Sequence, residues 1–205
     1  MGFYAEHVVP RIVDKACGIK AAVPYRQRVC AGLSGEVVEI GFGSGLNVPH
    51  YPAGVVSVAA VEPSDLAWKL AGRRLADSAV PVRRSGLDGQ HLPFEDDSFD
   101  AALSTWTMCT IPDVEAALQE LRRVLRPGGS LHFVEHGQAP DKKVRRMQRR
   151  IEPLNKRIFA GCHLTRPITD LITGAGFQIK EIDVFYEPGA PKFANADSLG
   201  VAVNG

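Results

Sequence analysis

The chain has 205 residues, of which 45% are hydrophobic and 23% charged, and its formal net charge at pH 7 is +1. This length and composition predict one soluble domain over residues 1–205, and the near-neutral charge argues against nucleic acid as a partner. No apolar run approaches the ~20 residues of a membrane span, and the first residues lack a signal-peptide pattern, so we expect a cytoplasmic protein. The cysteines lack the spacing of a zinc site, which predicts free thiols and no metal. They are Cys17, Cys30, Cys109 and Cys162.

The N-terminal residues 3–17 carry apolar side chains near helical spacing, and Gly18 follows them as a stop signal. Pro10 interrupts the pattern, which predicts either two short helical pieces or one kinked helix. Two interpretations stay open for this helical region, which we assign to residues 1–32. It either packs on the sheet or forms a lid over a ligand cleft.

Residues 36–51 join a buried strand to a glycine-rich turn. Residues 37–40 form the short, largely apolar run that is typical of a strand covered on both faces. Glycines then recur at every second position, where they let the backbone turn tightly and approach a ligand closely. Their G-x-G-x-G spacing differs from the G-x-G-x-x-G fingerprint of dinucleotide sites. These glycines are Gly41, Gly43 and Gly45.

Two carboxylates accompany this turn. Glu39 lies two positions before the first glycine, where a negative charge favours a cationic ligand group such as an ammonium over a diphosphate. Residues 56–62 predict a second buried strand that ends in Glu62, which is placed to accept hydrogen bonds from the hydroxyls of a ribose. The carboxylates and the glycines together favour a nucleotide-type cofactor site over a plain strand-to-helix turn.

The rest of the chain alternates strand and helix patterns. Ser64 predicts the N-cap of a helix that ends at Ala76, and Asp113 predicts the cap of a helix over residues 114–125. Strands alternating with helices indicate right-handed parallel connections, hence a doubly wound α/β sheet. The last two strands have no helix between them, which predicts an antiparallel hairpin at the C-terminus. The seven predicted strands cover residues 37–40, 56–62, 82–84, 99–105, 131–135, 177–185 and 198–203.

Before the last two strands lies an inserted segment, about 141–166, that contains a basic helix. Residues 142–157 hold eight Lys or Arg against one Glu, and Pro153 is expected to bend the helix. One interpretation is a lid helix with its apolar side toward the body of the protein. The other is an amphipathic helix that contacts an anionic membrane surface or guides a lipid-like substrate. The apolar stripe comprises Val144, Met147, Ile151, Leu154 and Ile158.

These motifs, in this order, resemble the class I S-adenosylmethionine-dependent methyltransferases, which have a Rossmann-like fold. The resemblance is to the small single-domain group that includes quinone-pathway methyltransferases. The glycine turn matches the family's first motif and residues 62–64 match the second. Asp88, a few positions before Leu92-Pro93-Phe94, matches the third, whose acidic side chain usually faces the adenine. The resemblance implies that S-adenosylmethionine is bound by Glu39, Gly41, Gly43, Gly45, Glu62, Pro63, Ser64, Asp88, Gly89 and Thr105.

Two further segments bear on the acceptor. Residues 161–166 are similar to a G-C-x-L-T-R segment of the methyltransferase-like protein 7 group, whose members methylate thiols. Residues 107–110 contain no histidine, although some family members have one after the fourth strand, so no role of that histidine is carried over.

The resemblance implies an enzyme that methylates a small, apolar acceptor, which could be a thiol, a quinol or an amine. In-line methyl transfer depends mainly on alignment, and a general base is needed only where the acceptor must lose a proton. His136 and His163 are the candidate catalytic residues, and Thr107 and Cys109 are the candidates on the acceptor side. Two alternatives remain: a non-catalytic module that binds the cofactor or a membrane surface, and a nicotinamide-dependent oxidoreductase, which the glycine spacing disfavours.

Overall fold

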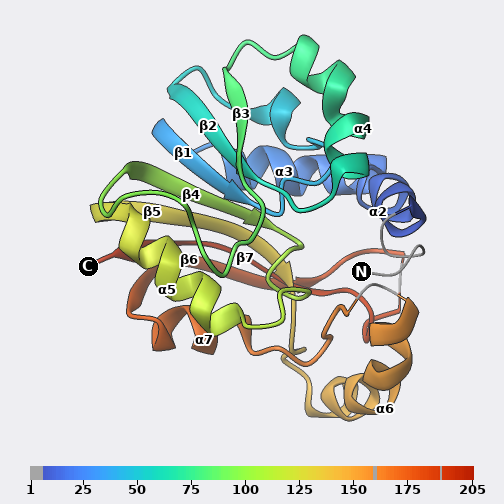
Figure 1. The fold of residues 1–205 in the computed structure, drawn as a ribbon. Helices are drawn as coiled ribbons and strands as arrows, with labels where there is room; N and C mark the ends of the chain where they lie inside the picture. Colours follow the sequence, from blue (N-terminus) through green and yellow to red (C-terminus); the bar gives the residue numbers. More distant parts are fainter. Residues whose placement is uncertain (1–6, 159–160, 190) are drawn as a thin grey trace.

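A seven-stranded mixed sheet forms the centre of the protein (Figure 1). The computed structural model of the chain describes residues 7–158, 161–189 and 191–205. The strand order is β3-β2-β1-β4-β5-β7-β6. Strands β1 to β5 are parallel, whereas β7 runs antiparallel to both β5 and β6. The strands are β1 (Gly35–Ile40), β2 (Val55–Val61), β3 (Val82–Gly86), β4 (Phe99–Thr105), β5 (Leu125–His136), β6 (Phe177–Tyr186) and β7 (Ala196–Asn204).

This topology confirms the predicted doubly wound sheet and the antiparallel C-terminal pair. The helices cover both faces of the sheet, with α3 and α4 on one side and α5 and α7 on the other. The described helices are α2 (Val9–Cys17), α3 (Val23–Cys30), α4 (Asp65–Ala76), α5 (Val114–Val124), α6 (Lys142–Ile158) and α7 (Ile168–Gly174), with short 3₁₀ helices at Lys20–Ala22 and Val48–His50. None of the helices in these described ranges is long and apolar enough to cross a membrane.

The predicted helix caps are confirmed. Ser64 Oγ accepts a hydrogen bond from Ala67 N–H at the start of α4. Asp113 Oδ1 accepts one from Ala116 N–H at the start of α5. Each cap satisfies a backbone donor that the first helical turn leaves without a partner.

Pro10 lies in the first turn of α2, where a residue without an N–H loses no helical hydrogen bond. Among the described residues, α2 thus begins at Val9 and has Pro10 as its second residue. The earlier part of the predicted helix, residues 3–6, lies outside the described residues.

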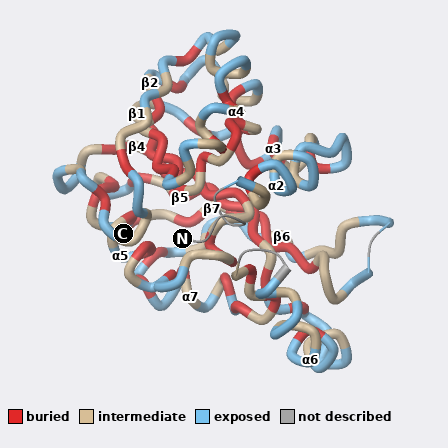
Figure 2. The backbone as a smooth tube through the Cα atoms, turned by 45° about the vertical axis from the view of Figure 1, so that its right-hand side comes forward, coloured by how far each residue is buried: buried red, intermediate tan, exposed pale blue. Residues whose placement is uncertain are grey.

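Helix α6 stands at the edge of the molecule, and most of its surface is exposed or half-buried (Figures 1 and 2). Its side toward the body is polar: Gln148 is 1% exposed, donates to Gly137 O and accepts from Ala139 N–H. Met147 and Leu154, by contrast, are 49% and 60% exposed. Of the two interpretations left open, the one with the apolar stripe toward the body would cover these two residues, and they are not covered, because a buried glutamine anchors the helix instead.

Candidate functional site

The glycine turn follows β1 at the carboxyl edge of the parallel strands, the edge at which open α/β sheets bind ligands. Gly41, Gly43 and Gly45 all have positive φ, at +66°, +58° and +74°. A Cβ on Gly41 would lie 2.1 Å from Thr107 Oγ1, so packing excludes a side chain there. A Cβ on Gly43 would meet nothing closer than Gly41 O at 3.8 Å. The space over Gly43 is therefore open, and only its left-handed backbone excludes a side chain.

Glu62 lies directly against this turn. Its Oε2 accepts a hydrogen bond of 2.7 Å from Gly43 N–H, and its Oε1 accepts one of 2.7 Å from Ser64 N–H. The side chain is 6% exposed, and burial raises its pKa, although both hydrogen bonds oppose the shift. The fold thus places the second motif beside the first, as a shared cofactor site requires. Direct contact of Glu62 with a ribose stays a prediction.

Glu39 belongs to a buried polar network behind the turn. Its carboxylate accepts hydrogen bonds from Tyr51 Oη and, at 2.9 Å, from Asn47 Nδ2. Burial raises the pKa of Glu39 to about 7, although these two hydrogen bonds oppose the shift. Asn47 Nδ2 also donates to Thr105 Oγ1 at 3.0 Å, and Arg26 Nη1 donates to Asn47 Oδ1 at 2.7 Å.

This network joins two predicted cofactor residues, Glu39 and Thr105, through residues that were not predicted to belong to the site. Because Glu39 is 1% exposed, it holds Asn47 and Tyr51 in this structure, and its contact with a cofactor ammonium stays a prediction. Asn47 and Tyr51 lie shortly after Gly45 in the sequence. Their polar side chains, so close to the glycine turn, were the signal that could have identified them as site residues.

The remaining predicted cofactor residues surround the same edge of the sheet. Asp88 is exposed, and its Oδ1 accepts two hydrogen bonds of 2.9 Å from Gln90, which lower its pKa. Gly89 lies close to Ile40 at the end of β1. Pro63 is exposed and Ser64 caps α4. The third motif thus reaches the end of β1 through Gly89.

A cavity of about 420 Å³ lies next to the polar network. Arg26 connects the two, since its Nη2 donates to Cys17 O, in the cavity wall, while its Nη1 donates to Thr105 Oγ1. Trp106 lines the cavity with φ of +51°, a strained conformation for a bulky residue, of a kind that clusters at functional sites. Helix α2 supplies part of the wall, as expected of a lid, through Ile12, Val13, Ala16 and Cys17.

The fold brings two predicted site residues together in this cavity. His136 at the end of β5 and Cys109 after β4 both line it, together with Cys162. The ligand atoms of these three side chains lie within 4.8 Å of one another. Asp197 on β7, which no sequence motif marked, places its Oδ1 3.6 Å from His136 Nε2. Sequence spacing gave no sign of this cluster, because its members come from separate elements.

The protonation of each member of the cluster depends on its neighbours. The hydrogen bond with Cys109 lowers the pKa of Cys162 to about 5, and His136 adds to that lowering while burial opposes it. Burial lowers the pKa of His136, but its hydrogen bond with Cys162 and the charge of Asp197 outweigh burial and raise it to about 9. The cluster therefore favours a thiolate beside an imidazolium.

The other two candidates lie elsewhere. Thr107 Oγ1 donates to Thr105 O at 3.1 Å and to Gly41 O at 3.4 Å, so it supports the glycine turn and is not part of the cavity wall. His163 Nδ1 lies 3.2 Å from Glu152 Oε1 on α6 and is also absent from the wall. Both proposed roles, acceptor binding by Thr107 and catalysis by His163, stay predictions without support from the cavity.

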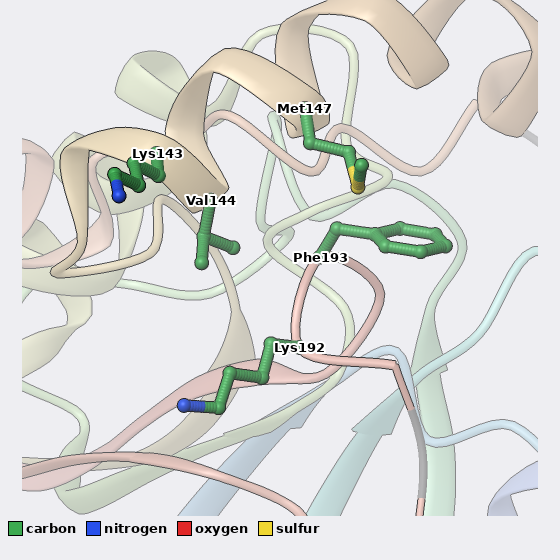
Figure 3. Close-up of a pocket in the computed structure, with 5 residues that line it drawn as sticks. All are labelled: Lys143, Val144, Met147, Lys192 and Phe193. Atoms are coloured by element: carbon green, nitrogen blue, oxygen red, sulfur yellow. The ribbon is translucent and has the colours of Figure 1, made fainter.

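A second, smaller cavity of about 300 Å³ lies under α6 (Figure 3). It is lined by Lys143, Val144 and Met147 of the helix and by Lys192 and Phe193. Figure 3 shows Met147 close to the ring of Phe193, whereas the two lysine ammonium groups point to the same side, away from that ring. This site holds basic and apolar side chains but none of the motif residues.

Comparisons with known proteins agree with this geometry. A family model described as a methyltransferase domain matches residues 38–133. Thiol S-methyltransferase TMT1B of Rattus norvegicus is 32% identical over 174 residues, which cover 77% of this chain and 66% of the rat protein. Demethylmenaquinone methyltransferase of Clavibacter sepedonicus is 33% identical over 121 residues, 58% of this chain and 49% of that protein. This chain thus spans less than two thirds of the length of either relative.

A solved S-adenosylmethionine-dependent methyltransferase from Thermotoga maritima has the same fold. It superposes with a TM-score of 0.70 at 25% identity, over 97% of this chain and 99% of that one. The strand order, the glycine turn with Glu62 against it, and these likenesses lead to one assignment. The chain belongs to the class I S-adenosylmethionine-dependent methyltransferases, as its motifs predicted.

Proposed function

We propose that this protein transfers the methyl group of S-adenosylmethionine to a small thiol. The observation that carries the proposal is the cavity of about 420 Å³ with Cys109, His136 and Cys162 in its wall, next to Thr105 at the cofactor edge. Its volume suits a small acceptor, and its wall combines apolar side chains with polarisable sulfur. The relatives named thiol S-methyltransferases support the same choice.

The cofactor would lie over Gly43, with its ribose toward Glu62 and its methyl group toward the cavity. The acceptor sulfur then forms a bond to the methyl carbon while the bond from that carbon to the sulfonium sulfur breaks, which releases S-adenosylhomocysteine. A thiolate is a strong nucleophile, so alignment of the two sulfur atoms supplies most of the catalysis. Of the two predicted catalytic histidines, His136 is the one that lines the acceptor cavity.

Methyl transfer to a panel of acceptors tests the proposal. The protein is incubated with S-adenosylmethionine and a small alkyl thiol, a quinol or an aminophospholipid, and the methylated product is identified by mass spectrometry. We expect methylation of the thiol alone. Methylation of only the quinol or only the amine would contradict the thiol assignment, and binding of S-adenosylhomocysteine with no product from any acceptor would favour a non-catalytic module.

We also propose that α6 contacts an anionic membrane surface. The observation that favours this role is the partial exposure of Met147 and Leu154 among exposed arginines, on a helix that Gln148 holds to the body. Apolar side chains flanked by basic ones are the pattern of helices that lie in the lipid headgroup region. Binding to vesicles with and without phosphatidylserine tests this proposal.

A further inference from the structure

Cys109, His136 and Cys162 have a geometry that methyl transfer alone does not require. Cys109 lies in the loop after β4, His136 ends β5, and Cys162 follows α6, so the fold gathers three potential metal ligands from distant parts of the chain. Their ligand atoms are all within 4.8 Å of one another. Both cysteines are buried, at 1% and 7% exposure, and cysteine thiolates and imidazole nitrogens are the ligands that zinc prefers.

The separations are close to those of a tetrahedral zinc site. With Zn–S near 2.3 Å and Zn–N near 2.0–2.1 Å, two ligands of one tetrahedral ion lie roughly 3.5–3.8 Å apart. Atoms within 4.8 Å of one another need only small side-chain rotations to reach that distance. Three protein ligands and one open position are the arrangement of catalytic zinc sites, whereas structural sites are closed by four.

Polar residues around the three side chains resemble the outer shell of hydrogen-bonding groups that usually orients metal ligands. Asp197, which is 1% exposed, lies beside His136 and accepts a hydrogen bond of 3.0 Å from Trp106 Nε1. Its other oxygen, Oδ2, is buried without a hydrogen-bond partner among the described residues. A carboxylate next to a ligating histidine orients the ring and strengthens it as a ligand. Asn155 Nδ2, in turn, donates to Cys162 O at 2.9 Å.

We propose that Cys109, His136 and Cys162 form a zinc site whose fourth position opens into the acceptor cavity. All three residues line that cavity, so a ligand at the fourth position would share its space with the acceptor. The role of the metal rests on the proposed function. An acceptor thiol binds zinc as a thiolate and loses its proton to solvent. Its sulfur then attacks the methyl carbon, the sulfonium C–S bond breaks, and S-adenosylhomocysteine leaves.

Cobalt(II) is the probe for the site, because it takes the same ligands and reports them by absorption. The reduced protein, residues 1–205, is titrated with Co²⁺ and then with Zn²⁺. We expect a thiolate-to-cobalt charge-transfer band and visible bands of tetrahedral cobalt, which Zn²⁺ abolishes. Protein whose thiols are titrated as free but which gives no such bands would overturn the site. A Cys109–Cys162 disulfide that persists in reductant would overturn it as well.

Variants assign the ligands. Cys109→Ser and Cys162→Ser are each expected to weaken the charge-transfer band, and His136→Gln to shift the visible bands. Cys17→Ser is the matched control, since Cys17 lines the same cavity outside the cluster. An equal loss in the control would contradict the assignment. Should a variant fail to fold, Zn²⁺ must still protect Cys109 and Cys162, but not Cys17, from alkylation in the unsubstituted protein.

Measurements of thiol methylation distinguish failure of the proposed zinc site from failure of the proposed methyltransferase function. Removal of metal by a chelator is expected to lower thiol methylation at least about tenfold, and Zn²⁺ to restore it. Cobalt bands without any methylated thiol would overturn the proposed function and leave the metal site standing. Thiol methylation that is unchanged by the chelator, in protein that gives no cobalt bands, would overturn the metal site and leave the function standing.

Discussion

At the scale of single residues, Gly43 is the position where backbone and ligand requirements can be separated. Its φ is +58°, and a Cβ there would lie in open space. Gly128, near the start of β5, has φ of +80° and equally open surroundings, but lies at the opposite edge of the sheet. Both positions would strain an alanine, yet only Gly43 lies where the cofactor is expected.

We therefore predict that Gly43→Ala and Gly128→Ala each destabilise the protein by about 1 kcal/mol, because alanine is strained in the left-handed conformation. Only Gly43→Ala should also weaken binding of S-adenosylhomocysteine, since its methyl group occupies the space over the turn. Chemical denaturation and calorimetric titration measure the two effects. Equal affinity of both variants would argue against a cofactor over Gly43.

Glu39 predicts a pH dependence of stability. Burial raises its pKa from 4.5 to about 7, so between these values the unfolded chain releases a proton that the folded chain keeps. Stability from this group is thus complete below pH 4.5 and declines as the pH rises to about 7, by at most about 1.4 kcal/mol per pH unit.

Glu39→Gln should remove that decline, because glutamine does not titrate. The difference in unfolding free energy, variant minus native chain, is expected to increase from pH 4.5 to pH 7 and to stay constant above it. Urea denaturation across this range measures it. A constant difference would mean that Glu39 is ionised throughout, as expected if a cation lies beside it.

Sequence reasoning could find those site residues whose signals are local in the chain. The glycines and Glu62 were predictable because a left-handed turn and a strand end are local properties. Cys162 was predicted to be an ordinary free thiol. Its partners, Cys109 and His136, are brought to it only by the fold of the sheet and the inserted segment. Acceptor binding by Thr107 stays a prediction, and the direction of its side chain, toward Gly41, could not be foreseen from the sequence.

At the scale of elements, α6 shows how one sequence pattern allows two orientations. The apolar stripe predicted which residues share a face, but Gln148, by bonding to residues 137 and 139, decides which side meets the body. Hydrophobic periodicity carries no information about a glutamine that finds buried backbone partners. The caps of α4 and α5, in contrast, were predictable because each cap involves residues only three positions apart.

For α6 we predict binding to phosphatidylserine vesicles and none to pure phosphatidylcholine vesicles. Replacing Arg145, Arg146, Arg149 and Arg150 by Gln should weaken that binding, because each basic residue near an anionic surface contributes about 1 kcal/mol. Flotation measures the bound fraction. Arg83→Gln on β3 is an exposed control away from α6 and should not change it. Vesicle binding that survives the fourfold change would locate the contact elsewhere.

At the scale of the whole molecule, the connections between the strands determine the class of the sheet. Alternating strands and helices predicted a parallel sheet, and the missing helix between β6 and β7 predicted the antiparallel pair, both of which the structure confirms. Such connections are predictable because few chain paths link adjacent strands. The nicotinamide alternative is disfavoured on a separate ground, since its fingerprint needs a different glycine spacing.

Ligand-induced stabilisation of the whole fold tests whether the cofactor is S-adenosylmethionine or a nicotinamide dinucleotide. A ligand that binds only the folded state, present at about 100 times its Kd, adds about 2.7 kcal/mol of stability, which for a domain of this size raises Tm by roughly 5–10 °C. We expect S-adenosylhomocysteine to produce this shift in differential scanning fluorimetry and NAD at the same concentration to produce none. The two ligands share an adenosine, so NAD controls for adenine binding alone. An equal shift with NAD would mean that the glycine turn accepts a diphosphate. That result would contradict the expectation, based on the glycine spacing and on the negative charge of Glu39, that a diphosphate is disfavoured there.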